Sequence, residues 1–267
     1  MKKNFYAILV LFMISSCSTN PYRLSNKSYK KQVNAYQKTI GSTFAKPLQN
    51  GSNPEWISTV NFNLRKPNFV VIHHTAQDSL QQTLKTFTLT RTQVSAHYVI
   101  SDDGTVVQML NDYLRAWHGG NAIWGKNTDI NSASIGIELD NNGSEPFSEA
   151  QINSLIALLS RLKKDYTIPS ANFIAHSDIA PTRKSDPSAF FPWKNLAELG
   201  FGLWPDPQLE KAPDYFNIEQ ALRIIGYDTR NLSSAIRAFK LHYIQSEVDD
   251  ILNEKTINTI YSIYKKQ

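Results

Sequence analysis

A short apolar run that ends in two adjacent histidines places the strongest constraint on this chain. Residues 69–74 read Phe-Val-Val-Ile-His-His, a β-rich run of the length of a buried strand. Four further runs of this kind follow, at 96–100, 105–110, 134–139 and 172–176. Helical patterns separate them, above all the apolar stripe of 152–166, and Asp102-Asp103-Gly104 forms a hairpin turn. Strands interleaved with helices predict an α/β fold with a mixed central β-sheet flanked by helices.

Past a proline-rich junction the strand patterns nearly vanish. Helical patterns remain at 218–225, 235–243 and 256–264. They predict a small C-terminal all-α domain of about 55 residues, near the lower size for independent folding. We therefore divide the chain into a signal peptide, a basic polar tether, a sheet domain and a helical domain, at 1–16, 17–54, 55–206 and 213–267.

The net charge of +5 is unevenly distributed. Residues 1–54 hold eight lysines and arginines and no acidic residue, which leaves 20 of the 28 basic residues against all 23 acidic ones in 55–267. A nucleic-acid-binding domain needs a basic surface on its folded body. We therefore expect no nucleic-acid partner and interpret the cationic arm as a solvated tether near anionic lipid headgroups.

The N-terminus has the pattern of an export leader. Two lysines precede an apolar run at 5–14, which is too short for a membrane span of about 20 residues. Ile14-Ser15-Ser16-Cys17 resembles the bacterial lipobox, whose cysteine is lipidated. The resemblance implies membrane attachment through Cys17 and, because Ser18 rather than aspartate follows, the periplasmic side of a Gram-negative outer membrane. An ordinary secretory leader with a free cysteine is the alternative.

The histidines indicate a metal site. Cys17 is the single cysteine, which excludes zinc sites built on several thiolates. His73 and His176 lie at the ends of predicted strands, where α/β sheets bind ligands, and Asp186 follows ten residues after His176. Two histidines and an aspartate with an open fourth position suit a catalytic zinc ion. Spacing alone is a weak signal for this site.

Five sequence motifs strengthen the evidence for this metal site. They are Val71-Ile72-His73-His74-Thr75-Ala76, Ser95-Ala96-His97-Tyr98, Ala116-Trp117-His118-Gly119, Ser134-Ile135-Gly136-Ile137-Glu138-Leu139 and the run 175–187 from Ala-His-Ser-Asp to Lys-Ser-Asp-Pro. In this order they resemble the zinc-dependent N-acetylmuramoyl-L-alanine amidases of the amidase_2 type. The resemblance is nearest to the AmiD-like branch of outer-membrane lipoproteins. It implies that 55–206 is the zinc amidase domain and 213–267 a peptidoglycan-binding-like domain.

The resemblance also implies the roles of the site residues. His73, His176 and Asp186 would bind one Zn²⁺ ion. Glu138 would take a proton from the attacking water and deliver it to the leaving nitrogen. Lys184 would stabilise the charge that develops on the carbonyl oxygen. A salt bridge for Glu138 and a solvated loop charge for Lys184 are the alternatives.

Further residues are candidates for metal binding, substrate binding or support of the site. Asp178 is an alternative carboxylate ligand, but the Lys-x-Asp pattern favours Asp186. Aromatic faces pack on sugar rings and an arginine fork binds carboxylates, which gives three candidates for substrate binding: Trp117, His118 and Arg183. Their alternatives are a core pair for the first two and simple exposure for the third. We expect structural or supporting roles for His74, His97 and His242.

The resemblance predicts the reaction. It is hydrolysis, by zinc-activated water, of the amide between the lactyl group of N-acetylmuramic acid and the L-alanine of the stem peptide. The partners would be peptidoglycan or muropeptides, and we expect a monomer. One alternative is a non-catalytic peptidoglycan-recognition lipoprotein of the same fold, but such proteins lack a zinc ligand and all three candidates are present here. A zinc endopeptidase acting within the stem peptide is a second alternative.

Overall fold

The computed structural model describes residues 20–42, 49, 64 and 66–267. The chain forms two compact units, at 1–61 and 62–267. The predicted signal peptide and the lipidation candidate Cys17 lie outside the described residues. Among the helices that are described, none is long and apolar enough to cross a membrane.

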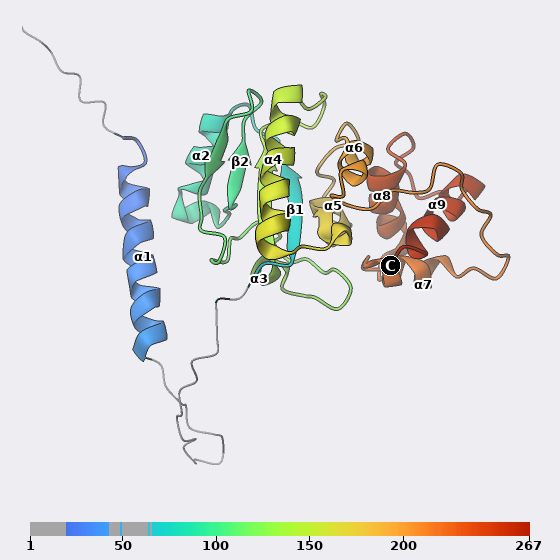
Figure 1. The fold of residues 1–267 in the computed structure, drawn as a ribbon, viewed down its shortest axis with the longest axis horizontal. Helices are drawn as coiled ribbons and strands as arrows, with labels where there is room; N and C mark the ends of the chain where they lie inside the picture. Colours follow the sequence, from blue (N-terminus) through green and yellow to red (C-terminus); the bar gives the residue numbers. More distant parts are fainter. Residues whose placement is uncertain (1–19, 43–48, 50–63, 65) are drawn as a thin grey trace, which may run out of the picture. The chain divides into compact units, whose positions relative to one another are not determined.

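The first unit contains one long helix, α1 (Arg23–Ser42), within the segment that we interpret as a tether (Figure 1). The sequence pattern did not predict it. Lysine, glutamine, alanine, leucine and arginine supply its good helix formers, and the backbone N–H of Tyr22 donates to the Asn20 side chain just before the first turn (2.8 Å). The helical spacing of Tyr29, Val33 and Tyr36 is the signal that was missed.

The second unit is built on a five-stranded mixed sheet (Figure 1). Its strands are β1 (Phe69–His74), β2 (Tyr98–Ile100), β3 (Val106–Gln108), β4 (Ser134–Leu139) and β5 (Phe173–Ala175). Their order is β3-β2-β4-β1-β5, and only the pairing of β2 with β3 in this sheet is antiparallel. The mixed central sheet predicted from the sequence is thus confirmed, including its hairpin.

The patterns predicted at 152–166, 218–225, 235–243 and 256–264 all lie in helices of this unit, whereas the short helices at 130–133 and 176–179 were not predicted. The helices of this unit are α2 (Leu80–Phe87), α3 (Ile130–Ala133), α4 (Glu149–Tyr166), α5 (His176–Ile179), α6 (Trp193–Glu198), α7 (Ile218–Ile225), α8 (Leu232–Tyr243) and α9 (Glu254–Tyr264), with 3-10 turns at Thr90–Thr92 and Ser170–Asn172. The helix α4 begins where the sequence predicts, because the Ser148 side chain accepts a hydrogen bond from the backbone of Gln151 (3.0 Å).

The two faces of the sheet are covered differently. On one face, Val70 and Ile72 of β1 join a core with the apolar stripe of α4. On the other face, Val71 and Ile174 join a core with α7, α8 and α9. Side chains alternate along a strand, so His73 lies on the face of Val71. The functional side chains therefore lie away from α4.

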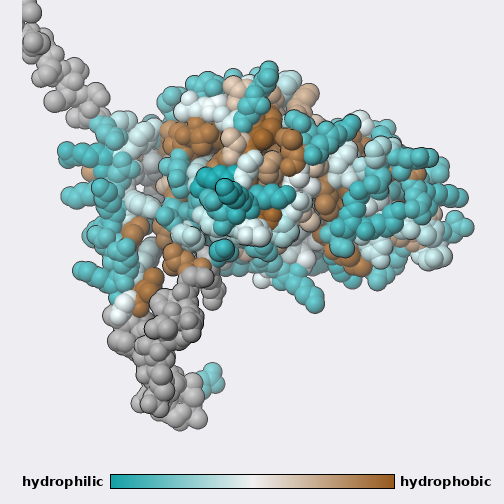
Figure 2. Space-filling view, viewed as in Figure 1, coloured by the Kyte–Doolittle hydropathy of each residue, from teal (hydrophilic) through white to brown (hydrophobic). Residues whose placement is uncertain are grey.

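The C-terminal helices share their core with the sheet. Too few residues lie in α7–α9 to enclose a large core of their own, and their apolar residues pack against the sheet. On the face shown in Figure 2, hydrophilic residues cover most of this helical end of the molecule. Residues 62–267 accordingly form one compact unit, and the domain boundary between 206 and 213 stays a prediction.

Candidate active site

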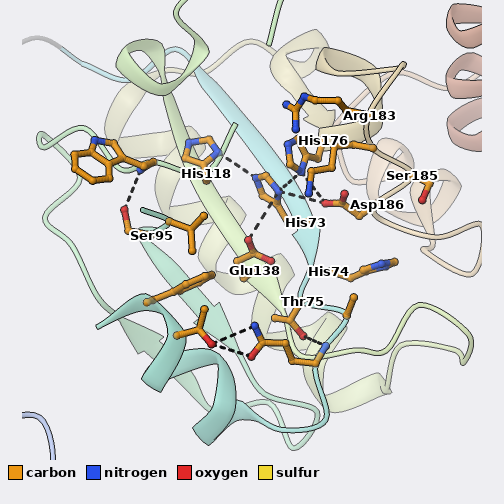
Figure 3. Close-up of a pocket in the computed structure, with 17 residues that line it drawn as sticks. His73, His74, Thr75, Ser95, His118, Glu138, His176, Arg183, Ser185 and Asp186 are labelled. Carbon is orange, nitrogen blue, oxygen red and sulfur yellow. Dashed lines mark hydrogen bonds and ion pairs between the residues drawn. The ribbon is translucent and has the colours of Figure 1, made fainter. Parts of the chain in front are cut away.

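The ends of three adjacent parallel strands bring the predicted site residues together (Figure 3). His73 near the end of β1 pairs in register with Glu138 of β4, so the two side chains lie next to each other. On the other side of β1, Ile72 pairs with Ala175, and His176 follows directly at the start of α5. The loop after α5 returns to place Asp186 beside both histidines.

Three atoms converge closely enough to share one metal ion. The Nδ1 atoms of His73 and His176 lie 2.9 Å apart. Asp186 Oδ2 lies 3.0 Å from Nδ1 of His176 and 3.3 Å from Nδ1 of His73. All three residues are buried, with at most 8% of their surface exposed. They form a group able to hold a metal ion, with both histidines presenting the same ring nitrogen.

The opposite ring nitrogens have their own hydrogen-bond partners. His73 Nε2 lies 3.1 Å from Nδ1 of His118, and His176 Nε2 lies 3.3 Å from the carbonyl oxygen of Gly119. A carbonyl only accepts, so Nε2 of His176 carries the proton and its Nδ1 keeps a lone pair. His73 fits the same tautomer, with the proton on Nε2 facing His118 and a lone pair on Nδ1. Ligating histidines in metal sites are held in this way, so these residues fit a bound zinc ion.

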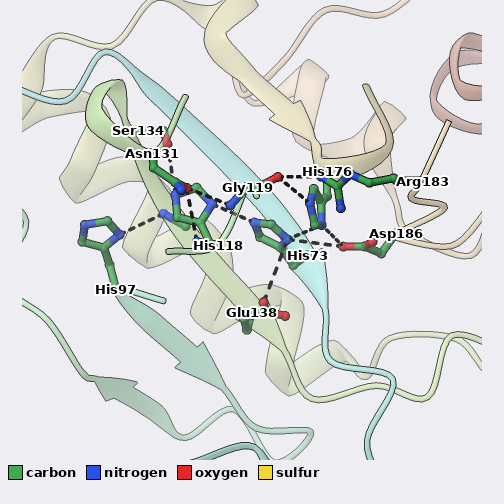
Figure 4. A network of polar contacts seen from close by, with 11 residues as sticks. His73, His97, His118, Gly119, Asn131, Ser134, Glu138, His176, Arg183 and Asp186 are labelled. Carbon is green, nitrogen blue, oxygen red and sulfur yellow. Dashed lines mark hydrogen bonds and ion pairs between the residues drawn. The ribbon is translucent and has the colours of Figure 1, made fainter. Parts of the chain in front are cut away.

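A relay of hydrogen bonds supports His73 from within the sheet (Figure 4). Nε2 of His118 lies 3.0 Å from the hydroxyl of Ser134, and this hydroxyl donates to the carbonyl of Ile130 (2.7 Å). The side chain of Asn131 accepts from the backbone N–H groups of His118 (3.2 Å) and Gly119 (2.8 Å). Ser134 and Asn131 were missed by reasoning from the sequence.

A glycine inside β4 was the available signal. A Cβ atom at Gly136 would lie 2.3 Å from Cγ of His118, so only glycine leaves room for this ring beside the strand. The backbone N–H of Gly136 also donates to His97 Nδ1 (3.0 Å). A glycine within a β-rich run thus marks the place where a histidine approaches the sheet.

The electrostatics of the cluster favour neutral histidines beside a charged aspartate. Burial, with the neighbouring His176, lowers the pKa of His73 to about 4. Burial also lowers the pKa of His118 well below its usual range. Although burial opposes its charge, the close contacts with His176 and His73 lower the pKa of Asp186. Neutral imidazoles and an ionised carboxylate are the forms that bind a metal.

Glu138 is the acid–base candidate at the edge of the cluster. Its Oε1 lies 3.9 Å from His73 Nδ1, and 12% of its side chain is exposed. Burial, assisted by the charge of Asp186, raises the pKa of Glu138 to about 8. Glu138 and Asp186 line a pocket of about 450 Å³ (Figure 3). The exposed Lys184 is also one of its lining residues.

Comparisons with known proteins agree with this geometry. Residues 63–189 match the family model described as N-acetylmuramoyl-L-alanine amidase. The N-acetylmuramoyl-L-alanine amidase AmiD of Escherichia coli (strain K12) is 36% identical over 206 residues, which covers 65% of this chain and 74% of AmiD. The chain belongs to the N-acetylmuramoyl-L-alanine amidase family.

Two solved structures of related proteins match about four fifths of this amidase. One is AmiD from E. coli in complex with the substrate anhydro-N-acetylmuramic acid-L-Ala-D-gamma-Glu-L-Lys, with a TM-score of 0.69 and 30% identity, covering 82% of this chain and 97% of that one. Another is AmpDh3 from Pseudomonas aeruginosa in complex with anhydromuramic pentapeptide, with a TM-score of 0.69 and 28% identity, covering 79% of this chain and 96% of that one.

The three substrate-binding candidates of the amidase occupy different positions. Trp117 is 48% exposed and lines the pocket. Arg183 also lines it, but its Nη2 donates to the carbonyls of Gly119 (2.8 Å) and Asn121 (2.9 Å), so this end of the guanidinium holds a loop. His118 is buried beside His73. Substrate binding stays a prediction for all three, and His118 has a supporting contact as well.

The remaining histidines of the amidase make structural contacts. Nε2 of His97 donates to the carbonyl of Leu114 (2.9 Å), and Nδ1 of His74 accepts from the backbone N–H of Ser188 (3.2 Å). Asp178, the alternative carboxylate ligand, is not part of the group that could hold a metal.

Proposed function

We propose that this amidase hydrolyses the amide bond between the lactyl group of N-acetylmuramic acid and the L-alanine of the stem peptide, with one zinc ion. The observation that supports it best is the convergence of His73 Nδ1, His176 Nδ1 and Asp186 Oδ2 beside Glu138 in an open pocket. A bound zinc ion lowers the pKa of a coordinated water and so supplies a nucleophile at neutral pH.

Glu138 acts first as the general base and then as the general acid in this proposal. Its carboxylate accepts the proton that the nucleophile loses and delivers it to the leaving nitrogen. Burial raises the pKa of Glu138, so the carboxyl group holds the proton between the two transfers. A carboxyl group whose pKa lies near neutral pH suits both tasks, because it accepts and releases a proton with little bias. A bound cation would lower this pKa and bring it closer to neutral.

Lys184 and Trp117 act on the substrate from the pocket wall. The carbonyl oxygen gains negative charge as it is attacked, and the Lys184 ammonium group stabilises that charge. The exposed ring of Trp117 offers a face on which a sugar ring packs. The pocket volume of about 450 Å³ suits a small ligand, such as one muramyl-peptide unit.

The site of action follows from the N-terminal sequence. We place the protein as a monomer on the periplasmic side of the outer membrane, anchored by a lipidated Cys17, with peptidoglycan or its muropeptides as the substrate. The leader pattern at 1–17 supports this proposal. We also propose that residues 213–267 bind peptidoglycan.

Mass spectrometry of the products tests the reaction. Purified zinc-loaded protein is incubated with a disaccharide carrying a tetrapeptide and, separately, with intact sacculi. We expect an intact peptide beginning at L-alanine together with peptide-free sugar. Cleavage within the peptide would instead show an endopeptidase. Unchanged muropeptides with tight binding would show a recognition protein.

A further inference from the structure

A fully buried carboxyl group, Asp178, lies two residues after His176 and has three hydrogen-bond partners. Its Oδ1 accepts from the hydroxyl of Tyr227 (2.6 Å), and its Oδ2 accepts from Nδ1 of His242 (2.7 Å) and the backbone N–H of Ala175 (2.8 Å). A buried carboxyl group needs such partners. Two of the three donors come from the C-terminal helical region, because Tyr227 follows α7 and His242 lies in α8.

Asp178 lies in the turn that presents the metal group. Its bond to Ala175 fixes the residue directly before His176. Ser177, which lies between His176 and Asp178, donates its backbone N–H to the carbonyl of Asp186 (2.9 Å). A displacement of Asp178 would therefore move both His176 and Asp186, whereas His73 is held separately by the sheet.

The two donors are themselves held rigidly. The Tyr227 ring packs edge-on against Trp124, with ring centroids 5.1 Å apart. A Cβ atom on the neighbouring Gly226 would lie 2.4 Å from Trp124, so the approach is as close as glycine allows. The His242 ring is stacked on Trp193, at 3.9 Å between centroids, and on Tyr243, at 4.0 Å.

The hydrogen bonds of His242 explain why a histidine occupies this stacked position. Its Nδ1 faces Asp178, while its Nε2 is buried and has no hydrogen-bond partner among the residues that the structure describes. Packing alone would be served better by an apolar side chain, which leaves no nitrogen unpaired. The bond to Asp178 is therefore the contact that the histidine supplies.

We propose that Tyr227 and His242 are positioning residues of the active site, which fix through Asp178 the turn that presents His176 and Asp186 to the metal. This inference rests on the zinc site of the proposed function. It makes α7 and α8 part of the catalytic framework, so the helical region has a task besides any binding of the cell wall.

Zinc affinity of the full chain tests the proposal, measured by competition with a chelator at a temperature where circular dichroism shows each variant folded. Tyr227→Phe removes only the hydroxyl, and His242→Leu removes the Nδ1 donor. We expect each to weaken zinc binding by about tenfold, at the low end of the loss typical for supporting residues of metal sites. The absorption spectrum of the cobalt-loaded protein should change as well, because it reports ligand geometry.

Two further variants separate positioning from a general loss of stability. His242→Asn places an amide donor near the position of Nδ1 and should restore most of the affinity. Lys240→Met, also in α8, removes the bond from the buried Lys240 ammonium group to the half-exposed Asp249 in place of a bond to Asp178. It should lower stability but leave zinc affinity unchanged.

Wild-type zinc affinity and cobalt spectra in both Tyr227→Phe and His242→Leu would overturn the proposal, as would an equal loss of affinity in Lys240→Met. These readouts need no substrate. A chain that binds zinc with the expected affinities but cleaves no muropeptide would contradict the proposed function and still confirm the positioning role.

Discussion

The two histidines of the metal group are held by different parts of the molecule. His73 lies in a central strand and is supported by side chains of the sheet domain, from His118 to Ser134. His176 begins a short turn and donates from Nε2 to the carbonyl of Gly119, and this turn contacts the C-terminal helices through Asp178. The first support comes from the sheet domain alone, whereas the second also depends on the C-terminal helices. A site of this kind is complete only when both regions are folded.

Removal of a ligand on either side should have the largest effect. His73→Ala takes away the ligand on the sheet and Asp186→Ala the ligand on the loop. Each should reduce turnover of a muropeptide to background and remove stoichiometric zinc, because the two remaining ligands cannot hold the ion in the geometry that catalysis requires. Inductively coupled plasma mass spectrometry together with product analysis checks this. Full activity in a zinc-free variant would contradict the proposed mechanism.

Glu138→Gln should separate catalysis from metal binding. The amide keeps the shape of the side chain but cannot accept the proton, so turnover should fall by about 10²- to 10⁴-fold. Zinc content should remain at the wild-type level. The exposed Glu149→Gln is the matched control and should have no effect. A similar loss in both variants would exclude the acid–base role of Glu138.

His118→Phe should remove the contact that supports His73 and leave the contacts of His176 in place. The ring is replaced by one of similar size that leaves Nε2 of His73 without an acceptor, so zinc affinity should fall by about 10- to 100-fold. His118→Asn offers an oxygen near the position of Nδ1 and should recover part of the affinity. Chelator competition measures both. Unchanged affinity in His118→Phe would show that the relay does not position His73.

The stability of the metal-free protein, measured in the presence of a chelator, should depend on pH, and this dependence should identify Glu138. Burial raises the pKa of this group from 4.5 to about 8, so the folded state binds more protons than the unfolded state between these values, and stability falls as the pH rises. The lowered pKa values of His73, His74, His97 and His118 change stability in the opposite direction, mostly below about pH 7.

Between pH 6.5 and 8 the contribution of Glu138 to the free energy of unfolding should therefore decrease by about 1.5 kcal/mol, measured as the difference between wild type and Glu138→Gln. In Glu138→Gln this decrease should disappear, whereas Glu149→Gln should retain it. Urea unfolding at several pH values in the presence of a chelator provides the measurement. A decrease of the same size in Glu138→Gln would assign it to another group.

The sequence predicted the elements of this fold better than the contacts between them. The strand ending at His73 and the strand carrying Glu138 are local patterns, and parallel pairing then places both residues at one edge. The choice of Asp186 over Asp178 rested on the Lys-x-Asp pattern, and geometry now supplies a reason, because Asp178 already accepts three hydrogen bonds.

Supporting contacts could not be predicted because they join distant segments. Nothing local to His242 indicates that it meets a carboxyl group 64 positions away. Gly136 was readable in principle, since a glycine inside a strand indicates close approach, but the strand pattern does not say which ring approaches. The helix α1 was missed because its apolar residues are few.

Anomalous X-ray diffraction at the zinc edge, from crystals of the zinc-loaded protein, tests the central claim most directly. We predict one strong peak at about 2.0–2.2 Å from Nδ1 of His73, Nδ1 of His176 and an oxygen of Asp186, with one position left for solvent. A peak elsewhere, or coordination through the Nε2 atoms that His118 and Gly119 contact here, would contradict the account.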